Sequence, residues 1–291
     1  MAFSHSDFRI DSLSIPLFII SLEKDIERRD SLKKFFPANL VDNYFPAFDA
    51  RNVSRQILDD RCNNHDLQLN PSYLRKLSAG EIGCTLSHRN IYKYIVENNL
   101  PFALVFEDDV LPLPDWHYIL HSAIKVAHLM DSKYATLIHL GLPNYRSVGK
   151  KRIVFMLGKK FIWRPEFRFV ESSLKNKFWL GHSYIITHEA AKRILKTYPL
   201  IPCMCDDWQE FYASGCFDSV ILTKNAFDQN FNFDSNLRDK HPNLFSYSSK
   251  YRSTSLVALS KKIVRAILNI LVLFDCSRWK LIRLENINQG R

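Results

Sequence analysis

The fold of this chain is decided by the stretch FALVFEDDV, residues 102–110. Five apolar residues lead directly into Glu107, Asp108 and Asp109, a pattern typical of a buried strand that ends in carboxylates. Because ligands of open α/β folds bind outside the carboxyl ends of the strands, this strand end predicts a binding site. The alternative interpretation is a strand followed by a solvated acidic turn.

The carboxylate cluster itself favours a cation. Three adjacent carboxylates repel one another, and such a cluster is stable mainly when a metal ion or a basic partner neutralises it. Oxygen ligands suit Mg²⁺ or Mn²⁺, which commonly bridge protein carboxylates and substrate phosphates. The residue types therefore predict a divalent metal at the end of this strand.

A helix is expected to begin just upstream, within LSAGEIGCTLSH, residues 77–88. Ser78 followed three residues later by Glu81 has the form of a capping box. Gly80 and Gly83 are poor helix formers, so something is expected to pack closely against the backbone of the first turns. A phosphate at the helix N-terminus and tight packing of the helix on the sheet are both open interpretations.

The chain resembles glycosyltransferase family 25, the lipooligosaccharide-biosynthesis galactosyltransferase family, which has collagen-modifying relatives. Four motifs in the family's order carry this resemblance: FIISL (18–22) with Arg28, LSAGEIGCTLSH followed by EDDV, WLGHSYIIT (179–187), and PCMCDDW (202–208). Ser21 stands where the family usually has asparagine, which is a mild departure. The resemblance extends over residues 16–233.

The resemblance implies a GT-A-like nucleotide-sugar-binding fold. It also implies the inverting transfer of a hexose, galactose, from a UDP-sugar to a lipooligosaccharide acceptor, with Mn²⁺ or Mg²⁺ held by Asp109 and Glu107. Donor contacts are expected from six residues: Ser21, Arg28, Glu81, His88, Glu107 and Asp108. For three of these a structural role is also open: Arg28 as a helix-surface charge, His88 as a buried histidine and Asp108 as a turn cap.

An inverting transferase needs a carboxylate base that deprotonates the acceptor hydroxyl. Asp206 and Asp207 are the candidates, because they lie at the expected start of a helix, where the dipole keeps a carboxylate ionised. Asp206 matches the family's motif better, although it also suits a plain helix N-cap. Asp228 and Gln229 resemble the family's late segment near the active site, which is a weaker signal.

Two other functions are compatible with part of this pattern. A family member that had become a non-catalytic membrane or assembly partner would not need the intact acids Glu107, Asp109 and Asp206. A metal-dependent phosphohydrolase would also use an acidic strand end. The chain has no obvious phosphate-accepting Asp motif or second ligand cluster for that chemistry.

Alternating elements predict the architecture around these motifs. Strands are expected near residues 17–21, 44–48, 102–106, 135–140, 183–187 and 220–222, and helices from Asp25, Ser78, Asp115, His188 and Asp206. Such alternation predicts an α/β fold with a mainly parallel sheet and helices on both faces. The basic and aromatic stretch 145–176 has no clean period and is expected to form acceptor-side hairpins or a mobile loop.

Composition and cysteine spacing set further limits. At 291 residues, 46% of them hydrophobic, the chain could hold one large domain or two small ones. Its six cysteines form no CxxC pair, which argues against zinc. The N-terminal apolar run has no basic segment before it and contains Pro16, so we interpret it as a strand and not as a secretory signal. Reduced thiols in a cytoplasmic protein are therefore expected.

The net charge of +10 is concentrated near the C-terminus. Residues 251–291 have eight Lys/Arg against two acids, a surplus of six. Apolar residues between 256 and 274 fall on one helical stripe, which predicts a basic amphipathic segment (251–291) after a catalytic domain (1–250).

Such a helix suits an anionic membrane, which would make the protein peripheral at the inner face of the inner membrane. The alternative is a helix packed on the catalytic domain. No recognition motif accompanies the basic tail, which argues against nucleic-acid binding.

Overall fold

The computed structural model of the chain describes residues 5–62, 76–130, 133–157, 159–171, 178–233 and 279–284. The strands are β1 (Ser6–Ile10), β2 (Leu13–Ser21), β3 (Phe45–Pro46), β4 (Phe102–Glu107), β5 (Val110–Pro112), β6 (Thr136–His139), β7 (Lys151–Leu157), β8 (Lys160–Val170), β9 (Ser183–Thr187), β10 (Ser219–Thr223), β11 (Phe227–Gln229) and β12 (Trp279–Leu284). The helices are α1 (Ile26–Leu32), α2 (Ala38–Asp42), α3 (Arg55–Asp59), α5 (Ala79–Glu97), α6 (Trp116–Leu129), α7 (Tyr145–Val148), α8 (His188–Thr197) and α9 (Trp208–Ala213), with a 3₁₀ turn, η1 (Ala50–Asn52).

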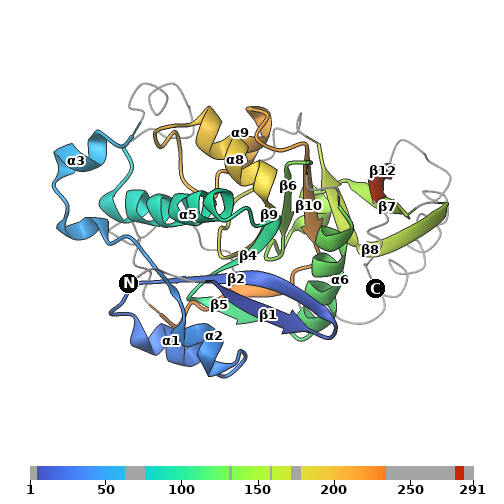
Figure 1. Cartoon of the computed structure of the whole chain (residues 1–291), viewed down its shortest axis with the longest axis horizontal. Helices are drawn as coiled ribbons and strands as arrows, with labels where there is room; N and C mark the ends of the chain where they lie inside the picture. The colour runs from blue at the N-terminus through green and yellow to red at the C-terminus, as the bar shows by residue number, and fades with distance from the viewer. Residues whose placement is uncertain are drawn as a thin grey trace, which may run out of the picture.

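Within the described residues, ten strands form one sheet with helices on both faces (Figure 1). The strand order is β1-β2-β4-β9-β6-β10-β8-β7-β12, and β3 pairs with β2 beside this path. Strands β5 and β11 form a separate two-stranded sheet next to the end of β4. The predicted α/β class with helices on both faces is confirmed, and the architecture is compatible with a GT-A-like fold.

The direction of the strands creates one functional edge. Strands β2, β4, β6 and β10 run the same way, so their carboxyl ends meet at one edge of the sheet. Strand β9 lies between β4 and β6 and is antiparallel to both. It starts at that edge, where the Glu107 N–H donates a hydrogen bond to the His182 carbonyl at 3.0 Å. The sheet is therefore mixed, whereas the sequence predicted a mainly parallel one.

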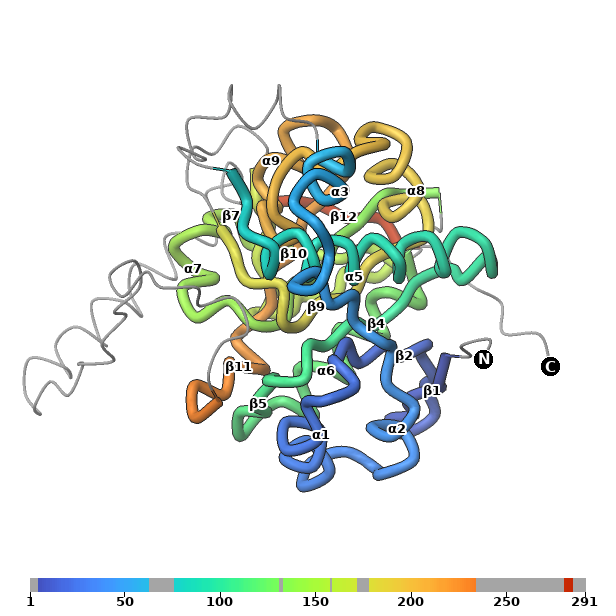
Figure 2. The backbone as a smooth tube through the Cα atoms, turned by 90° about the vertical axis from the view of Figure 1, so that its left-hand side faces the viewer, coloured from blue at the N-terminus to red at the C-terminus, as the bar shows by residue number. Residues whose placement is uncertain are grey.

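Two apolar layers bury the central strands on both faces. Leu104 and Phe106 of β4 point into the layer shared with α1, α2 and α6. Ala103 and Val105 point into the layer shared with α5, α8 and α9. Figure 2 shows α8 and α9 at the top and α1 and α2 at the bottom, with the sheet between them. Because both faces of β4 are covered, the strand is continuously apolar up to its carboxylates.

The predicted start of α5 is confirmed. The Glu81 N–H donates to the Ser78 hydroxyl at 3.2 Å, and the Ser78 N–H donates to the Glu81 carboxylate at 2.7 Å, which completes the capping box. A Cβ at Gly83 would lie only 2.7 Å from the Phe48 carbonyl oxygen. The expected close packing against the first turns of α5 is therefore found at Gly83, but its partner is the chain at Phe48 and Ala50 and not the sheet.

The predicted strand 183–187 coincides with β9, and the helix expected after Asp115 is α6, with Asp115 at its N-cap. The stretch 145–176 forms α7 and the β7–β8 hairpin in its described part. The amphipathic helix predicted between 256 and 274 lies outside the described residues. Farther along, β12 pairs in parallel with β7 at the end of the sheet. None of the helices in the described ranges is long and apolar enough to cross a membrane.

Candidate functional site

A pocket lies at the carboxyl edge of β2 and β4. Ile20 of β2 is directly opposite Glu107 of β4, so the ends of the two strands are neighbours. The pocket also contacts α1, the chain before α5, and the first turns of α5. Its lining residues are Ile20, Ser21, Leu22, Asp25, Arg28, Ala47, Phe48, Asp49, Ala50, Arg51, Gly80, Gly83, Cys84, Ser87, Glu107, Asp108, Asp109 and Gln229.

Arg28 bridges two of the three carboxylates. Helix α1 directs its guanidinium to Asp108, with 2.9 Å between Nε and Oδ1, and to Asp109, with 2.7 Å between Nη2 and Oδ2. Arg28 is therefore part of the acidic cluster and not an isolated surface charge. Burial raises the pKa of Asp108 to about 6, although Arg28 opposes the rise. Burial and the charge of Glu107 raise the pKa of Asp109 to about 8 against the same guanidinium.

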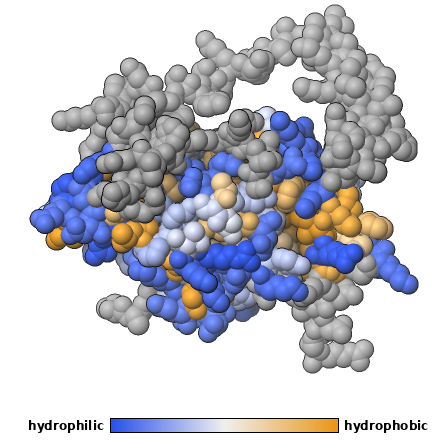
Figure 3. Space-filling model, turned by 90° about the horizontal axis from the view of Figure 1, so that it is seen from above, coloured by the Kyte–Doolittle hydropathy of each residue, from blue (hydrophilic) through white to orange (hydrophobic). Residues whose placement is uncertain are grey.

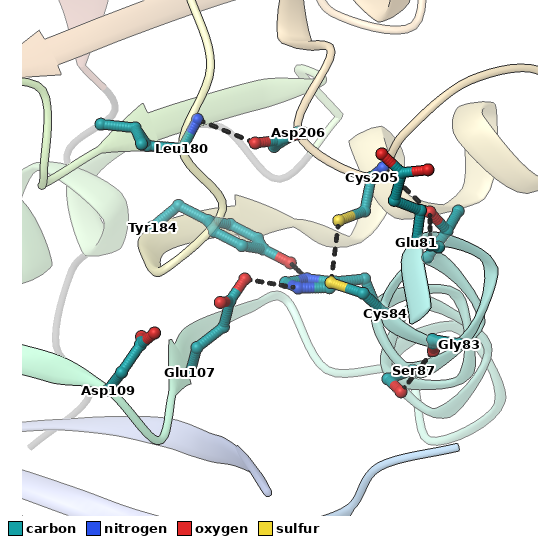
Figure 4. Close-up of polar contacts among 12 residues, drawn as sticks. Glu81, Gly83, Cys84, Ser87, Glu107, Asp109, Leu180, Tyr184, Cys205 and Asp206 are labelled. Carbon is teal, nitrogen blue, oxygen red and sulfur yellow. Dashed lines mark hydrogen bonds and ion pairs between the residues drawn. The ribbon is translucent and has the colours of Figure 1, made fainter. Parts of the chain in front are cut away.

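Glu107 is held from behind by a buried histidine. His88 Nε2 lies 3.2 Å from Glu107 Oε1, and His88 Nδ1 lies 2.6 Å from the Tyr184 hydroxyl (Figure 4). Burial opposes the charge on His88, but the nearby Cys84 and Glu107 outweigh burial and raise its pKa to about 10. Burial likewise opposes the charge on Glu107, yet His88 holds its pKa below the usual range. His88 is fully buried and does not line the pocket, so it orients Glu107.

The carboxylates fit a divalent metal. Asp109 Oδ1 is buried and has no hydrogen-bond partner among the described residues. A buried carboxylate oxygen in that state costs free energy unless a cation or donor approaches it. Glu107 uses Oε1 for His88 and has a second oxygen. Mg²⁺ and Mn²⁺ sites often use one or two carboxylates and take their remaining ligands from water and substrate phosphates. Asp109 and Glu107 would hold such a metal.

The Asp206-Asp207 pair divides into two roles. Asp207 is 1% exposed and is the N-cap of α9, where it accepts a hydrogen bond from the Glu210 N–H at 3.2 Å. Asp206 Oδ2 accepts one from the Leu180 N–H at 3.0 Å, and Oδ1 is buried without a hydrogen-bond partner in the described chain. Burial raises the pKa of Asp206 to about 6, although the Leu180 bond opposes the rise. The N-cap alternative considered for Asp206 belongs to Asp207.

The turn before β9 brings Glu107 and Asp206 close to each other. A Cβ built on Gly181 would lie 3.1 Å from Glu107 Oε1, 3.4 Å from Asp206 Cβ and 3.6 Å from His88 Cε1. A side chain at position 181 would therefore crowd Glu107 and contact Asp206 and His88, which favours glycine there. The glycine in WLGHS is the sequence signal for a close contact at this position. Only the tertiary structure shows that the neighbour is Glu107.

The remaining predicted donor contacts are placed differently. Ser21 lines the pocket, is 1% exposed and accepts a hydrogen bond from Arg29 at 2.8 Å. Glu81 is engaged in the capping box and is absent from the pocket lining. Arg29, which the sequence analysis did not single out, also donates to the Glu23 carbonyl at 2.8 Å and stacks on Tyr44. It fixes the loop that follows β2.

The sequence analysis did not single out two buried histidines near the site. Burial lowers the pKa of His139 to about 3, so the ring is neutral, and its Nε2 contacts the Leu180 carbonyl at 2.7 Å. Burial also lowers the pKa of His182, whose Nε2 lies 3.3 Å from the Phe227 carbonyl. His139 therefore holds the backbone of the turn that contains Gly181, and His182 ties the start of β9 to β11.

Cys84, His88 and Cys205 form a cluster that the cysteine spacing did not predict. The two sulfur atoms lie 3.4 Å apart, and one ligand atom from each residue lies within 4.8 Å of the others. Both ring nitrogens of His88 already have partners, Tyr184 and Glu107. Each imidazole nitrogen offers one in-plane position, so a metal would have to displace one of these bonds. The cluster is better described as packing around His88.

Comparison with known proteins gives a match over most of this architecture. Residues 14–208 match the family described as "Glycosyltransferase family 25 (LPS biosynthesis protein)". A "Glycosyltransferase 25 family member" of Anopheles gambiae is 29% identical over 199 residues, 67% of this chain and 31% of the relative. The chain thus spans about a third of the length of that relative.

Two further relatives have more specific names. "Procollagen galactosyltransferase 1-A" of Xenopus laevis is 25% identical over 256 residues, 84% of this chain and 34% of that protein. "Lacto-N-neotetraose biosynthesis glycosyltransferase LgtE" of Neisseria meningitidis is 26% identical over 203 residues, 66% of this chain and 65% of that protein. The family match begins in β2 and ends at the start of α9, so it includes Glu107, Asp109 and Asp206.

Proposed function

Because the chain belongs to glycosyltransferase family 25, we propose that it transfers galactose from UDP-galactose to a lipooligosaccharide acceptor with inversion at the anomeric carbon. Membership in this family supports a glycosyltransferase with a sugar donor and an oligosaccharide acceptor. The choice of galactose is supported by the names of the related galactosyltransferases, and the choice of acceptor by the family description and by the name of the Neisseria relative.

One observation carries this proposal. Glu107, Asp108 and Asp109 end a buried strand inside a pocket, Arg28 bridges two of them, and the Asp109 oxygen Oδ1 has no hydrogen-bond partner within the described ranges. The leaving nucleoside diphosphate is strongly negative, so this chemistry requires cationic groups beside it. Arg28 is one such group at the same strand end.

We expect a divalent metal at this site, and the available ligand atoms support it. A bound Mn²⁺ or Mg²⁺ would neutralise the charge of the leaving diphosphate. Asp109 offers a buried oxygen without a partner, and Glu107 offers its second oxygen while His88 holds the first. The fixed orientation of Glu107 matters because ligand and donor groups act best when they are positioned before the reaction.

Asp206 is our choice for the general base. Inversion in one displacement requires a carboxylate to take the proton of the attacking acceptor hydroxyl. Asp206 Oδ2 is held by the Leu180 N–H, and its Oδ1 is left to accept that proton. A pKa of about 6 keeps the carboxylate mostly ionised at neutral pH and basic enough to receive a proton.

We place the reaction at the cytoplasmic face of the inner membrane, with the protein as a peripheral enzyme. The acceptor proposed here is a glycolipid, so the enzyme must reach a lipid surface. The surplus of six basic residues in 251–291 supports attraction to an anionic membrane.

Transfer by the purified full-length chain tests the function. UDP-galactose, UDP-glucose and UDP-N-acetylglucosamine are each offered with truncated lipooligosaccharide acceptors, with Mn²⁺, with Mg²⁺ and with EDTA. The expected result is a galactosylated product only when metal is present, with the anomeric configuration opposite to that of the donor by NMR. Release of UDP without any sugar on an acceptor would support a phosphohydrolase, and inactivity with every nucleotide sugar would support the non-catalytic alternative.

A further inference from the structure

The outer end of the sheet has an exposed apolar face in the part of the chain that the structure describes. We call it the outer hairpin face and define it by Val154, Met156, Phe161, Trp163 and Leu281. Val154 is opposite both Trp163 and Leu281 in the strand pairing, and Met156 is opposite Phe161, so the five side chains share one side of the sheet. Phe161 is 69% exposed, Trp163 50% and Leu281 48%. Figure 3 shows hydrophobic surface at the end of the molecule where Figure 1 places β7 and β8.

The other side of the same strands belongs to the core. Ile153 and Phe155 of β7 are fully buried and pack in the layer that contains α6. Strand alternation then fixes Val154 and Met156 on the outside. The hairpin is therefore apolar on both sides, the one that faces the core and the one that faces outward. Contiguous exposed apolar surface of this kind marks an interaction site more often than isolated exposed side chains do.

Basic residues surround the outer hairpin face. Between positions 150 and 168 the sequence has seven Lys/Arg residues: Lys150, Lys151, Arg152, Lys159, Lys160, Arg164 and Arg168. The one acid in this interval, Glu166, is only 7% exposed, and Glu171 just beyond it pairs with Lys151 at 2.6 Å. Strand β12 adds Arg283 beside Leu281 on this side, whereas Lys280 lies over the Phe169 ring on the core side. A partner for this face must therefore combine apolar material with negative charge.

We propose that the outer hairpin face docks on an anionic lipid bilayer, with Phe161 and Trp163 in the interface and the surrounding Lys/Arg side chains on lipid headgroups. Aromatic side chains favour the membrane interface, and basic residues near an anionic surface add to the attraction. This proposal rests on the proposed function and adds to it the surface of the protein that meets the membrane.

Charge argues against two other occupants. A second copy of the chain would bring two strongly basic hairpins together, which like-charge repulsion opposes. Lys280 and Arg283 on the edge strand β12 add to that repulsion and disfavour edge-to-edge pairing. Residues 251–278, which precede β12 in the same chain, have five Lys/Arg against one acid, so they do not complement the charge of the face either.

Vesicle binding by the full-length protein tests the proposal without measuring sugar transfer, so its failure and a failure of the proposed function are separate results. Sedimentation is measured with vesicles of phosphatidylcholine alone and with added phosphatidylglycerol, at low and high salt. The test variant is Phe161→Ser/Trp163→Ser. The matched control is Tyr118→Ser, which removes an aromatic side chain that is 56% exposed on α6.

The wild type and Tyr118→Ser are expected to bind anionic vesicles and to lose binding at high salt. The double variant is expected to bind at least about tenfold more weakly, because two large apolar side chains no longer enter the interface. Trp163→Phe supplies a second readout if the double variant does not fold. The fluorescence difference between wild type and Trp163→Phe should shift to the blue when anionic vesicles are added.

Equal binding by the double variant and the wild type would overturn the proposal and assign membrane contact to another segment. It would also be overturned if the wild type ignored anionic vesicles at low salt, or if the Trp163 emission did not change. Self-association without vesicles that is lost in the double variant would assign the face to a second copy instead.

Discussion

The carboxylate of Asp206 accepts a hydrogen bond from the backbone N–H of Leu180, with 3.0 Å between Oδ2 and N. Leu180 has a φ of 86°, in the left-handed region that side chains other than glycine rarely adopt. Its carbonyl is held from the other side by His139 at 2.7 Å and Trp208 at 3.2 Å. Strained backbone of this kind persists only where surrounding contacts over-determine it. These contacts fix one carboxylate oxygen of Asp206 in place. Asp206 therefore does not serve as a helix cap.

The Asp206→Asn variant is expected to lower kcat by at least about a hundredfold, the lower range for loss of a general base. Donor affinity should change little, because the base acts on the acceptor. Asp207→Asn is the matched control, since Asp207 caps α9. It should keep most of its activity and lose at most about 1 kcal/mol of stability. A large loss of kcat in Asp207→Asn alone would assign the base to that residue.

The Asp109→Ala variant is expected to abolish transfer and to weaken metal-dependent UDP binding while the fold is kept. The variant removes the buried oxygen that we assign to the metal and also relieves repulsion among the three carboxylates. UDP titrations by calorimetry, with Mn²⁺ and with EDTA, measure the effect. Wild-type turnover with an unchanged response to Mn²⁺ would exclude Asp109 as a metal ligand.

The stability of the metal-free protein should depend on pH through Asp109. Its pKa is about 8 in the folded protein against an ordinary value of 3.8, so the folded state binds this proton more tightly than the unfolded state. The free energy of unfolding should therefore fall as pH rises from about 4 to about 8, by at most about 1.4 kcal/mol per pH unit for this group. Urea unfolding at several pH values should show a shallower fall in Asp109→Asn. Identical slopes in the two proteins would contradict the prediction.

The Gly181→Ala variant tests whether the turn before β9 positions Glu107. The new methyl group would lie 3.1 Å from Glu107 Oε1, so the carboxylate must shift by a few tenths of an ångström. We expect a lower kcat with a small change in melting temperature. Gly215→Ala is a useful comparison, because a Cβ at Gly215 would meet no atom within 4 Å, although its φ of 77° adds strain. Unchanged kinetics in Gly181→Ala would mean that Glu107 does not need this exact position.

Much of the fold and part of the site could be predicted from local patterns. The apolar run that ends at Glu107 and the Ser78–Glu81 capping box each depend on residues within a few positions, and both are confirmed. Arg28 was predicted as a donor contact and is found bridging Asp108 and Asp109. The mixed direction of the sheet was not predicted, because alternation along the chain does not show that β9 inserts between β4 and β6.

The sequence by itself determined which strand ends in carboxylates, where α5 begins and which family the motifs resemble, because each depends on neighbouring residues. Only the tertiary structure decided between Asp206 and Asp207. The two are adjacent and chemically identical, and their environments differ through partners far away in sequence or in the following helix: Leu180 for Asp206 and the Glu210 N–H for Asp207. The same holds for His88, whose role follows from contacts with Glu107 and Tyr184 that residue spacing does not encode. Long-range packing sets burial and hydrogen-bond partners, and these set the charge and the chemistry of each group.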